Sequence, residues 1–221
     1  MSQNAKVHNQ KLPRSVSVQF QPQVNHQSAE LNKTYYISAL EDSVAITTLK
    51  FYISNISFSG NDIAYVQEDQ RYYLIDLEDL SSLKRSIKLP AKANYNTLSF
   101  SIGVDSTTQT DGAKGGELDP TNGMYWSWQS GYINFKLEGT TQSCPARNNT
   151  FQFHIGGYQH PYNTLQATGF EVDNLENVII EINLNKILTK ENITTHYQIM
   201  SPNTKAMKFA ENLPNTFSLV P

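Results

Sequence analysis

The stretch that decides the fold is LKFYISNISF, residues 49–58. In its first half, every second residue is apolar: Leu49, Phe51 and Ile53. A period of two is typical of a β-strand that turns one face to a core. The apolar positions then continue at Ile56 and Phe58, on the opposite parity. This change of parity near Asn55 indicates a β-bulge, which would bend the strand.

The same alternation, or a short aromatic run, recurs along the chain: Val16–Phe20, Tyr72–Ile75, Leu98–Ile102, Ile133–Leu137, Phe151–Ile155 and Val178–Leu184. Alternation is typical of antiparallel sheets with one solvated face. No long amphipathic segment separates these strands, which argues against βαβ units. Two short helices are expected, at Leu184–Thr189 and Asn203–Asn212. The sequence therefore predicts an all-β fold, an antiparallel immunoglobulin-like β-sandwich with long loops. We expect residues 1–14 to be a flexible lead-in to one domain at 15–221.

Composition narrows the class of function. The chain has 221 residues, with 17 basic and 20 acidic residues and a net charge of −3. This balance argues against binding nucleic acid, which rewards strongly basic surfaces. No apolar run approaches the ~18 residues that a transmembrane helix needs. Cys144 is the single cysteine, so the chain cannot form an internal disulfide. No nucleophile elbow, P-loop or dinucleotide fingerprint is present, and we do not expect an enzyme.

The longest stretch without periodicity, Asp105–Gly123, leads directly into GMYWSWQSGY, residues 123–132. Long irregular loops in compact domains are often functional. Trp126 and Trp128 lie two residues apart in an extended segment, so they project from one face, together with Met124. Such a stripe can pack in a core, form a platform for sugar rings or wall a site for a soft metal ion. The residues alone leave these three alternatives open.

The chain has five histidines: His8, His26, His154, His160 and His196. Alternation places His154 opposite the apolar face of its strand, together with Gln152. We therefore expect His154 to face away from the main core, on the same side as the long loop. His160 follows in a turn marked by Pro161, and two imidazoles near one strand end could share a metal ion. The other interpretation is that His154 is a hydrogen-bonded structural residue.

Several short motifs occur together in a fixed order along the chain. They are TLKFYISNI (48–56), LDP (118–120), GMYWSWQSGY (123–132), FHIGGY (153–158) and IMSP (199–202). In this order they resemble the MbnP-like copper-binding protein family, in the form found in Bacteroidetes-type bacteria. The resemblance covers roughly residues 15–217, and the tryptophan motif is its most specific part.

The resemblance implies a periplasmic or secreted β-sandwich, often a lipoprotein, that binds copper(I) through histidine and a tryptophan oxidised to kynurenine. A di-haem partner of the MauG type would make that modification. By motif, His154 is the family's histidine before Gly-Gly, and Trp126 or Trp128 is the modifiable indole. Some relatives carry a histidine in the loop before the tryptophan motif, which is absent here, so His160 is the nearest candidate for a further ligand.

Two hypotheses follow. The first is a copper(I)-binding protein of metal acquisition or homeostasis, exported to the periplasm or cell surface, with its signal sequence outside the given chain. Its metal site would involve His154, His160, Trp126 and Trp128. The second is a non-catalytic binding or adhesion module, for a glycan or a protein, that uses the tryptophans as an aromatic platform and needs no metal.

Overall fold

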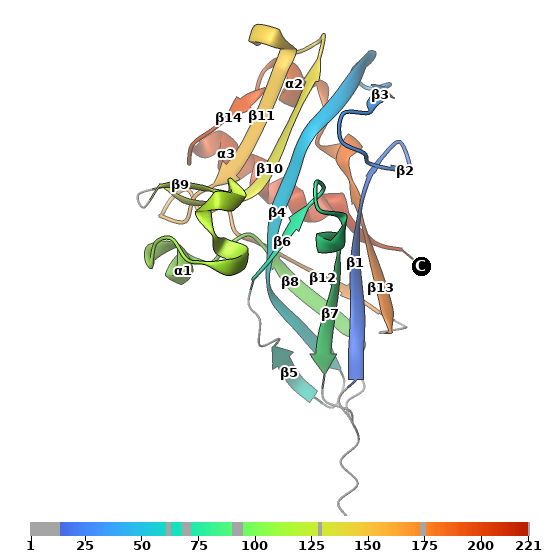
Figure 1. The fold of residues 1–221 in the computed structure, drawn as a ribbon, viewed down its shortest axis with the longest axis vertical. Coiled ribbons are helices and arrows are strands. Elements are labelled where there is room, and N and C mark those ends of the chain that lie inside the picture. The colour runs from blue at the N-terminus through green and yellow to red at the C-terminus, as the bar shows by residue number, and fades with distance from the viewer. Residues whose placement is uncertain are drawn as a thin grey trace, which may run out of the picture.

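The computed structural model describes residues 14–60, 63–67, 72–89, 95–127, 130–172 and 176–220 (Figure 1). The strands are β1 (Arg14–Val24), β2 (Gln27–Ser28), β3 (Thr34–Ile37), β4 (Asp42–Gly60), β5 (Ile63–Gln67), β6 (Tyr72–Asp76), β7 (Lys84–Leu89), β8 (Thr97–Ile102), β9 (Tyr125–Ser127), β10 (Gly131–Thr141), β11 (Thr150–Gly156), β12 (Gln166–Glu171), β13 (Asn177–Asn183), β14 (Gln198–Ile199) and β15 (Phe217–Leu219). The α-helices are α1 (Ser106–Thr110), α2 (Lys190–Thr194) and α3 (Thr204–Asn212). Six 3₁₀ turns join them in the described part: η1 (Leu80–Leu83), η2 (Gly116–Leu118), η3 (Pro120–Asn122), η4 (Arg147–Asn149), η5 (Leu184–Lys186) and η6 (Leu213–Thr216). Of the predicted lead-in, only Arg14 is described, and it begins β1.

The described strands form two sheets. The first has the order β15-β13-β1-β2, with β7 also paired to β1. The second has the order β12-β8-β4-β10-β11-β14, and β3, β5 and β6 pair with β4 while β9 pairs with β10. Strand β4 is 19 residues long and runs through the middle of the second sheet (Figure 1). Its register shifts between Ser54 and Ser57, where Asn55 has a φ of 51°, so the bulge predicted from the parity change is confirmed.

Aromatic rings from both sheets meet in the main core. Phe51 of β4 packs against Phe20 of β1 and Phe217 of β15, with ring centroids 6.1 and 5.8 Å apart. Phe100 of β8 lies 5.8 Å from the ring of Phe20, and Phe135 of β10 stacks on Phe51 at 5.8 Å. Packing of two sheets face to face around buried aromatics confirms the predicted all-β sandwich class.

The sheets are mixed rather than purely antiparallel, because β1 runs parallel to β13 and β11 runs parallel to β14. The prediction of an antiparallel sandwich was therefore wrong at these two pairings. The cause is that a strand with one buried face shows the same period of two whichever way its neighbour runs. Alternation identifies strands and their faces, and leaves the direction of pairing open.

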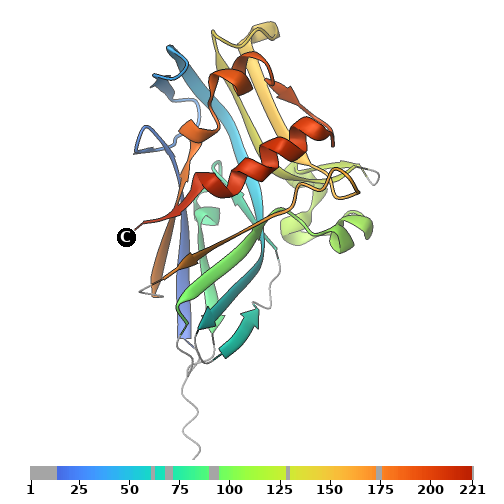
Figure 2. The same cartoon turned by 180° about the vertical axis from the view of Figure 1, so that it is seen from behind.

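Helix α3 covers part of the second sheet on its core side (Figure 2). The side chain of Asn203 accepts a hydrogen bond from the Ala206 backbone N–H at 2.9 Å, which caps the helix as the sequence indicated. Phe209 of α3 packs against Phe153 of β11, with ring centroids 5.1 Å apart. The other predicted helix, Leu184–Thr189, is only partly confirmed. It is a 3₁₀ turn at η5, and α2 starts afterwards because Thr189 caps the next turn.

The stretch Asp105–Gly123 is folded, and the expectation of a structureless loop was wrong. Asp105 accepts a hydrogen bond from the Thr108 N–H at 3.0 Å and starts α1, while Asp119 accepts one from Thr121 at 2.8 Å and starts η3. These short turns lie on the outer face of the second sheet. They cover a second, smaller cluster of buried residues: Tyr52, Leu74, Val104, Leu118, Met124, Tyr132 and Ile133. The candidate site lies beside this cluster.

Candidate metal site on the outer face of the second sheet

Strands β10 and β11 separate apolar and polar side chains between their two faces. Their core-facing residues are fully buried: Phe135, Leu137, Phe151, Phe153 and Ile155. The alternate positions carry Lys136 and Glu138 on β10 and Gln152 and His154 on β11, with Lys136 paired to His154. His154 therefore faces away from the main core, on the side where the folded loop lies, as the alternation predicted.

His154 is buried although it faces outward, with 6% of its surface exposed. Its Nε2 lies 2.6 Å from Oε1 of Glu138. Thr48 donates a hydrogen bond to the other oxygen of Glu138 at 3.0 Å, and Gln152 donates one to Oε1 at 3.4 Å. The hydrogen bond from His154, then the positive charge of Lys136 and the hydrogen bond from Thr48, lower the pKa of Glu138 to about 2. Glu138 is thus a carboxylate anion at neutral pH.

The ionised carboxylate determines which imidazole nitrogen carries the proton. A carboxylate only accepts hydrogen bonds, so Nε2 of His154 must carry the proton that Glu138 receives. Nδ1 of a neutral imidazole then holds a lone pair, and no hydrogen bond joins it to a residue in the described ranges. A histidine whose other nitrogen donates to a carboxylate is the arrangement found around protein-bound metal ions.

Trp126 lies on the same face, near the end of β11. Its strand, β9, pairs with β10, and its ring is pressed against Gly156. A Cβ atom added to Gly156 would stand 2.8 Å from Cζ3 of the indole, so the ring occupies the space above that glycine. Gly156 follows His154 by two residues and faces the same way, about 7 Å further along the strand. The fold therefore brings His154 and the half-buried Trp126 to one area.

Among the described residues, no contact joins His160 to this area. His160 is exposed in the turn after β11, with a cis bond to Pro161, and its role as a further ligand stays a prediction. Trp128 lies outside the described residues. Met124 is fully buried in the second cluster, as is Tyr132, so neither belongs to an exposed aromatic platform. In the described ranges, no three His, Cys, Asp or Glu side chains cluster in a way that could hold a metal.

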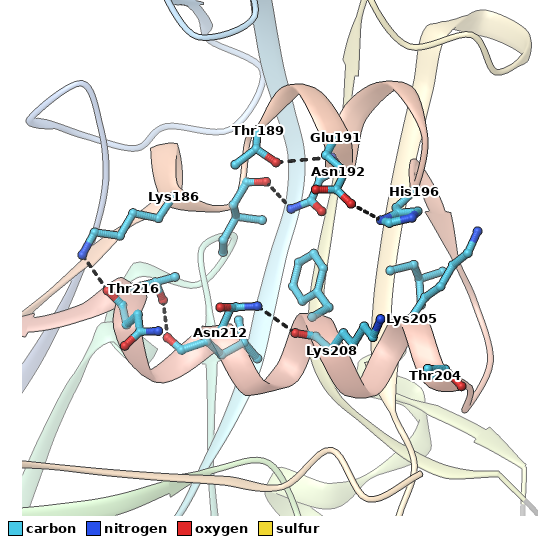
Figure 3. A pocket seen from close by; sticks show the side chains of 15 residues that line it. Lys186, Thr189, Glu191, Asn192, His196, Thr204, Lys205, Lys208, Asn212 and Thr216 are labelled. Carbon is cyan, nitrogen blue, oxygen red and sulfur yellow. Dashed lines mark hydrogen bonds and ion pairs between the residues drawn. The ribbon is translucent and has the colours of Figure 1, made fainter.

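A cavity of about 630 Å³ lies elsewhere, between α3 and the segment from η5 to α2 (Figure 3). Its polar groups mostly satisfy nearby backbone atoms. Asn212 donates to the carbonyl of Lys208 at 2.9 Å, and Lys186 donates to that of Asn215 at 2.6 Å. His196 lies there 3.8 Å from Glu191. These bonds secure helix ends rather than converge on a ligand, so the cavity is a weaker candidate than the outer face.

The sequence interpretation missed Glu138. A single glutamate at a polar position of an alternating strand looks like an ordinary solvated residue. The alternation along β10 does show that Glu138 lies on the same face as Lys136, opposite the apolar Leu137. It does not show which residue Glu138 contacts. Its role depends on the register that places β10 beside β11.

The comparisons with known proteins agree with this fold. The family model for MbnP matches residues 13–204. The chain belongs to the MbnP family. The resemblance seen in the ordered motifs is thus confirmed, and membership of the MbnP family supports a metal-related role.

A solved structure, MbnP from Methylosinus trichosporium, is similar with a TM-score of 0.67 over 94% of this chain and 98% of that one. The two sequences are 13% identical, so this likeness shows the MbnP fold alone. No curated protein matches the sequence. In the described part of this MbnP-family chain, no helix is long and apolar enough to cross a membrane.

Proposed function

We propose that this protein binds copper(I) on the outer face of the second sheet, with Nδ1 of His154 as a ligand. The observation that carries the proposal is the 2.6 Å bond between His154 and the ionised Glu138. It leaves one imidazole nitrogen with a lone pair and holds the ring in a single orientation. Imidazole suits copper, and membership of the MbnP family supports a metal-related role.

Trp126 is the indole that we assign to this site. An intact indole has only an N–H donor and is a poor ligand, whereas kynurenine has a carbonyl oxygen and an aniline nitrogen. The family resemblance implies that such an oxidation occurs in relatives, through a di-haem partner of the MauG type. The position of the Trp126 ring against Gly156, beside His154, supports Trp126 as the residue modified here.

The role that we propose is binding rather than catalysis, in an exported protein of copper acquisition or homeostasis. The outer face holds its histidine rigidly, because Glu138 accepts hydrogen bonds from His154, Thr48 and Gln152. A rigid, pre-oriented ligand favours tight binding of an ion, because less conformational freedom is lost when the ion binds.

Anaerobic titration with copper(I), in competition with a chromogenic chelator, tests the proposal on protein expressed in its native host. His154→Ala should weaken the affinity at least 100-fold. His196→Ala is the matched control, because it also removes an imidazole but lies in the cavity beside α3, away from the outer face. It should stay within threefold of the unaltered protein. Equal affinities of the His154→Ala and unaltered proteins would contradict the proposal. Metal-independent glycan binding lost in Trp126→Ala would favour an aromatic binding platform instead.

A further inference from the structure

The cavity between α3 and the segment from η5 to α2 combines an apolar inner wall with a basic rim (Figure 3). Its volume of about 630 Å³ is typical of sites that bind small organic molecules. Four apolar side chains line it, each more than nine-tenths buried: Ile187, Ile199, Phe209 and Leu213. Such a wall favours contact with the apolar part of a ligand over contact with water.

The rim of this cavity carries more positive than negative charge. Lys186, Lys205 and Lys208 line it, against one carboxylate among the described lining residues, Glu191. The side chain of Glu191 is 76% exposed, so water screens most of its charge. The chain as a whole has a net charge of −3, so this basic rim differs in sign from the rest of the protein. A cleft lined by positive charges attracts anions.

Two of these lysines lie side by side on α3 without a counter-charge. Lys205 and Lys208 are three residues apart, so they project from the same face of the helix. Neither ammonium group forms a hydrogen bond or ion pair with a residue that the structure describes. Neighbouring like charges on a helix repel each other, and an anion bound between them would relieve this repulsion.

The other polar side chains of the cavity hold its walls in place. Asn192 donates a hydrogen bond to the carbonyl of Ile187 at 2.8 Å, and Thr216 donates one to that of Leu213 at 2.7 Å. Both bonds are local and secure the ends of the elements around the cavity. The lysine ammonium groups therefore remain as charged donors for a ligand.

An apolar wall beside a pair of ammonium groups fits an amphipathic organic anion. A small inorganic anion would leave the apolar wall without a contact, and a neutral apolar molecule would leave the lysines without a counter-charge. In the described ranges, no three metal-ligating side chains cluster, which also argues against a metal ion here.

We propose that this cavity binds an organic carboxylate with an apolar body. The apolar body lies against Phe209 and Leu213, and the carboxylate lies between the ammonium groups of Lys205 and Lys208. A fatty acid of medium length has this chemistry.

Calorimetric titration with three probes tests which chemistry the cavity recognises. Decanoate carries an apolar chain and a carboxylate, acetate carries only the carboxylate, and decyltrimethylammonium carries a similar chain with a positive charge. Decanoate should bind saturably, at a stoichiometry of one, and both other probes should bind at least tenfold more weakly. Equal binding of decanoate and decyltrimethylammonium, or no binding of decanoate, would overturn the inference.

A double variant tests the two lysines. Lys205→Gln with Lys208→Gln should weaken decanoate binding about fivefold or more, because two ion pairs are lost. Both residues are exposed, so the fold should be kept. Lys84→Gln with Lys88→Gln is the matched control, because it removes the same charge from two exposed positions of β7 in the first sheet. Equal affinities of the two double variants would contradict the assignment.

Nuclear magnetic resonance locates the bound probe independently of any substitution. Adding decanoate should shift the backbone amide signals of α2 and α3 and leave those of β7 unchanged. Shifts of similar size in β7 and α3 would mean that decanoate binds without a site, and the inference would fail.

This inference does not rest on the proposed function. Helix α3 covers the second sheet on its core side, so the sheet separates the cavity from the outer face (Figure 2). His154→Ala should therefore bind decanoate within about twofold of the unaltered protein. Loss of decanoate binding in His154→Ala would overturn the inference of a separate site. Unchanged copper(I) affinity in His154→Ala, with decanoate binding intact, would overturn the proposed function alone.

Discussion

The two faces of strands β10 and β11 differ sharply although they share one backbone. The core face presents apolar side chains such as Phe135 and Phe153, which are fully buried. The outer face presents Glu138 and His154, joined by a short hydrogen bond, with His154 buried and Glu138 half-buried. Successive residues of a strand point to opposite faces of the sheet. Residues that stabilise the core can therefore alternate with polar residues that carry chemistry, and one set can change without disturbing the other.

The largest loss of stability is expected from a substitution on the core face. Phe153→Ala should lower the free energy of unfolding by about 3–5 kcal/mol, because Phe153 is fully buried and its ring lies 5.3 Å from that of Phe151. Gln152→Ala, one position away on the outer face, should cost about 1 kcal/mol or less. Urea denaturation measures both, and similar losses in the two variants would contradict the division of roles.

A smaller loss of stability is expected from a substitution at Gly156, where the outer face is tightly packed. In Gly156→Ala the new Cβ would lie 2.8 Å from the Trp126 ring and 2.7 Å from the backbone oxygen of Tyr132, which cannot move aside easily. We expect a loss of about 1–3 kcal/mol and a shift in tryptophan fluorescence. Gly115→Ala is the control, because its Cβ would meet no atom within 4 Å. If Gly156→Ala is as stable as the unaltered protein, the indole of Trp126 does not lie against Gly156.

The smallest effect concerns Glu138, and it depends on pH. Glu138→Gln removes a charged acceptor and should cost about 1–2 kcal/mol at pH 7. The pKa of Glu138 falls from 4.5 to about 2 on folding. Its ionisation therefore adds stability above pH 4.5, and this contribution disappears as the pH falls toward 2. Unfolding of both proteins between pH 7 and 2 should show the difference shrinking in that window, and a constant difference would contradict the pairing with His154. Glu78→Gln is the control, because Glu78 forms an exposed ion pair. Its stability difference from the unaltered protein should hardly change with pH.

Much of the fold could be predicted because the alternation of apolar residues within a strand identifies that strand. The alternation in LKFYISNISF predicted both β4 and the bulge at Asn55. The parallel pairing of β1 with β13 could not be predicted, since the period of two is the same for either direction. The turns of 105–123 were missed because each is only three to five residues long, and two of the three depend on a capping aspartate.

The residues of the candidate site also divide into those that the sequence could predict and those that it could not. The outward direction of His154 follows from local alternation and was predicted correctly. Glu138 could not be assigned, because its role depends on the neighbouring strand with which β10 pairs. A glutamate on the surface is an ordinary residue by itself. Only the register of β10 with β11 brings Glu138 beside the imidazole of His154.

The parallel pairing of β1 with β13 also has a consequence for folding kinetics. Ser17 pairs with Asn177, a sequence separation of 160 residues (177 minus 17). During synthesis, the first strand must wait for most of the chain to emerge before this neighbour exists. Contacts between such distant residues slow folding, because a long loop must close before they form. We therefore expect the first sheet to be completed late, with one edge of β1 unpaired until the last quarter of the chain arrives.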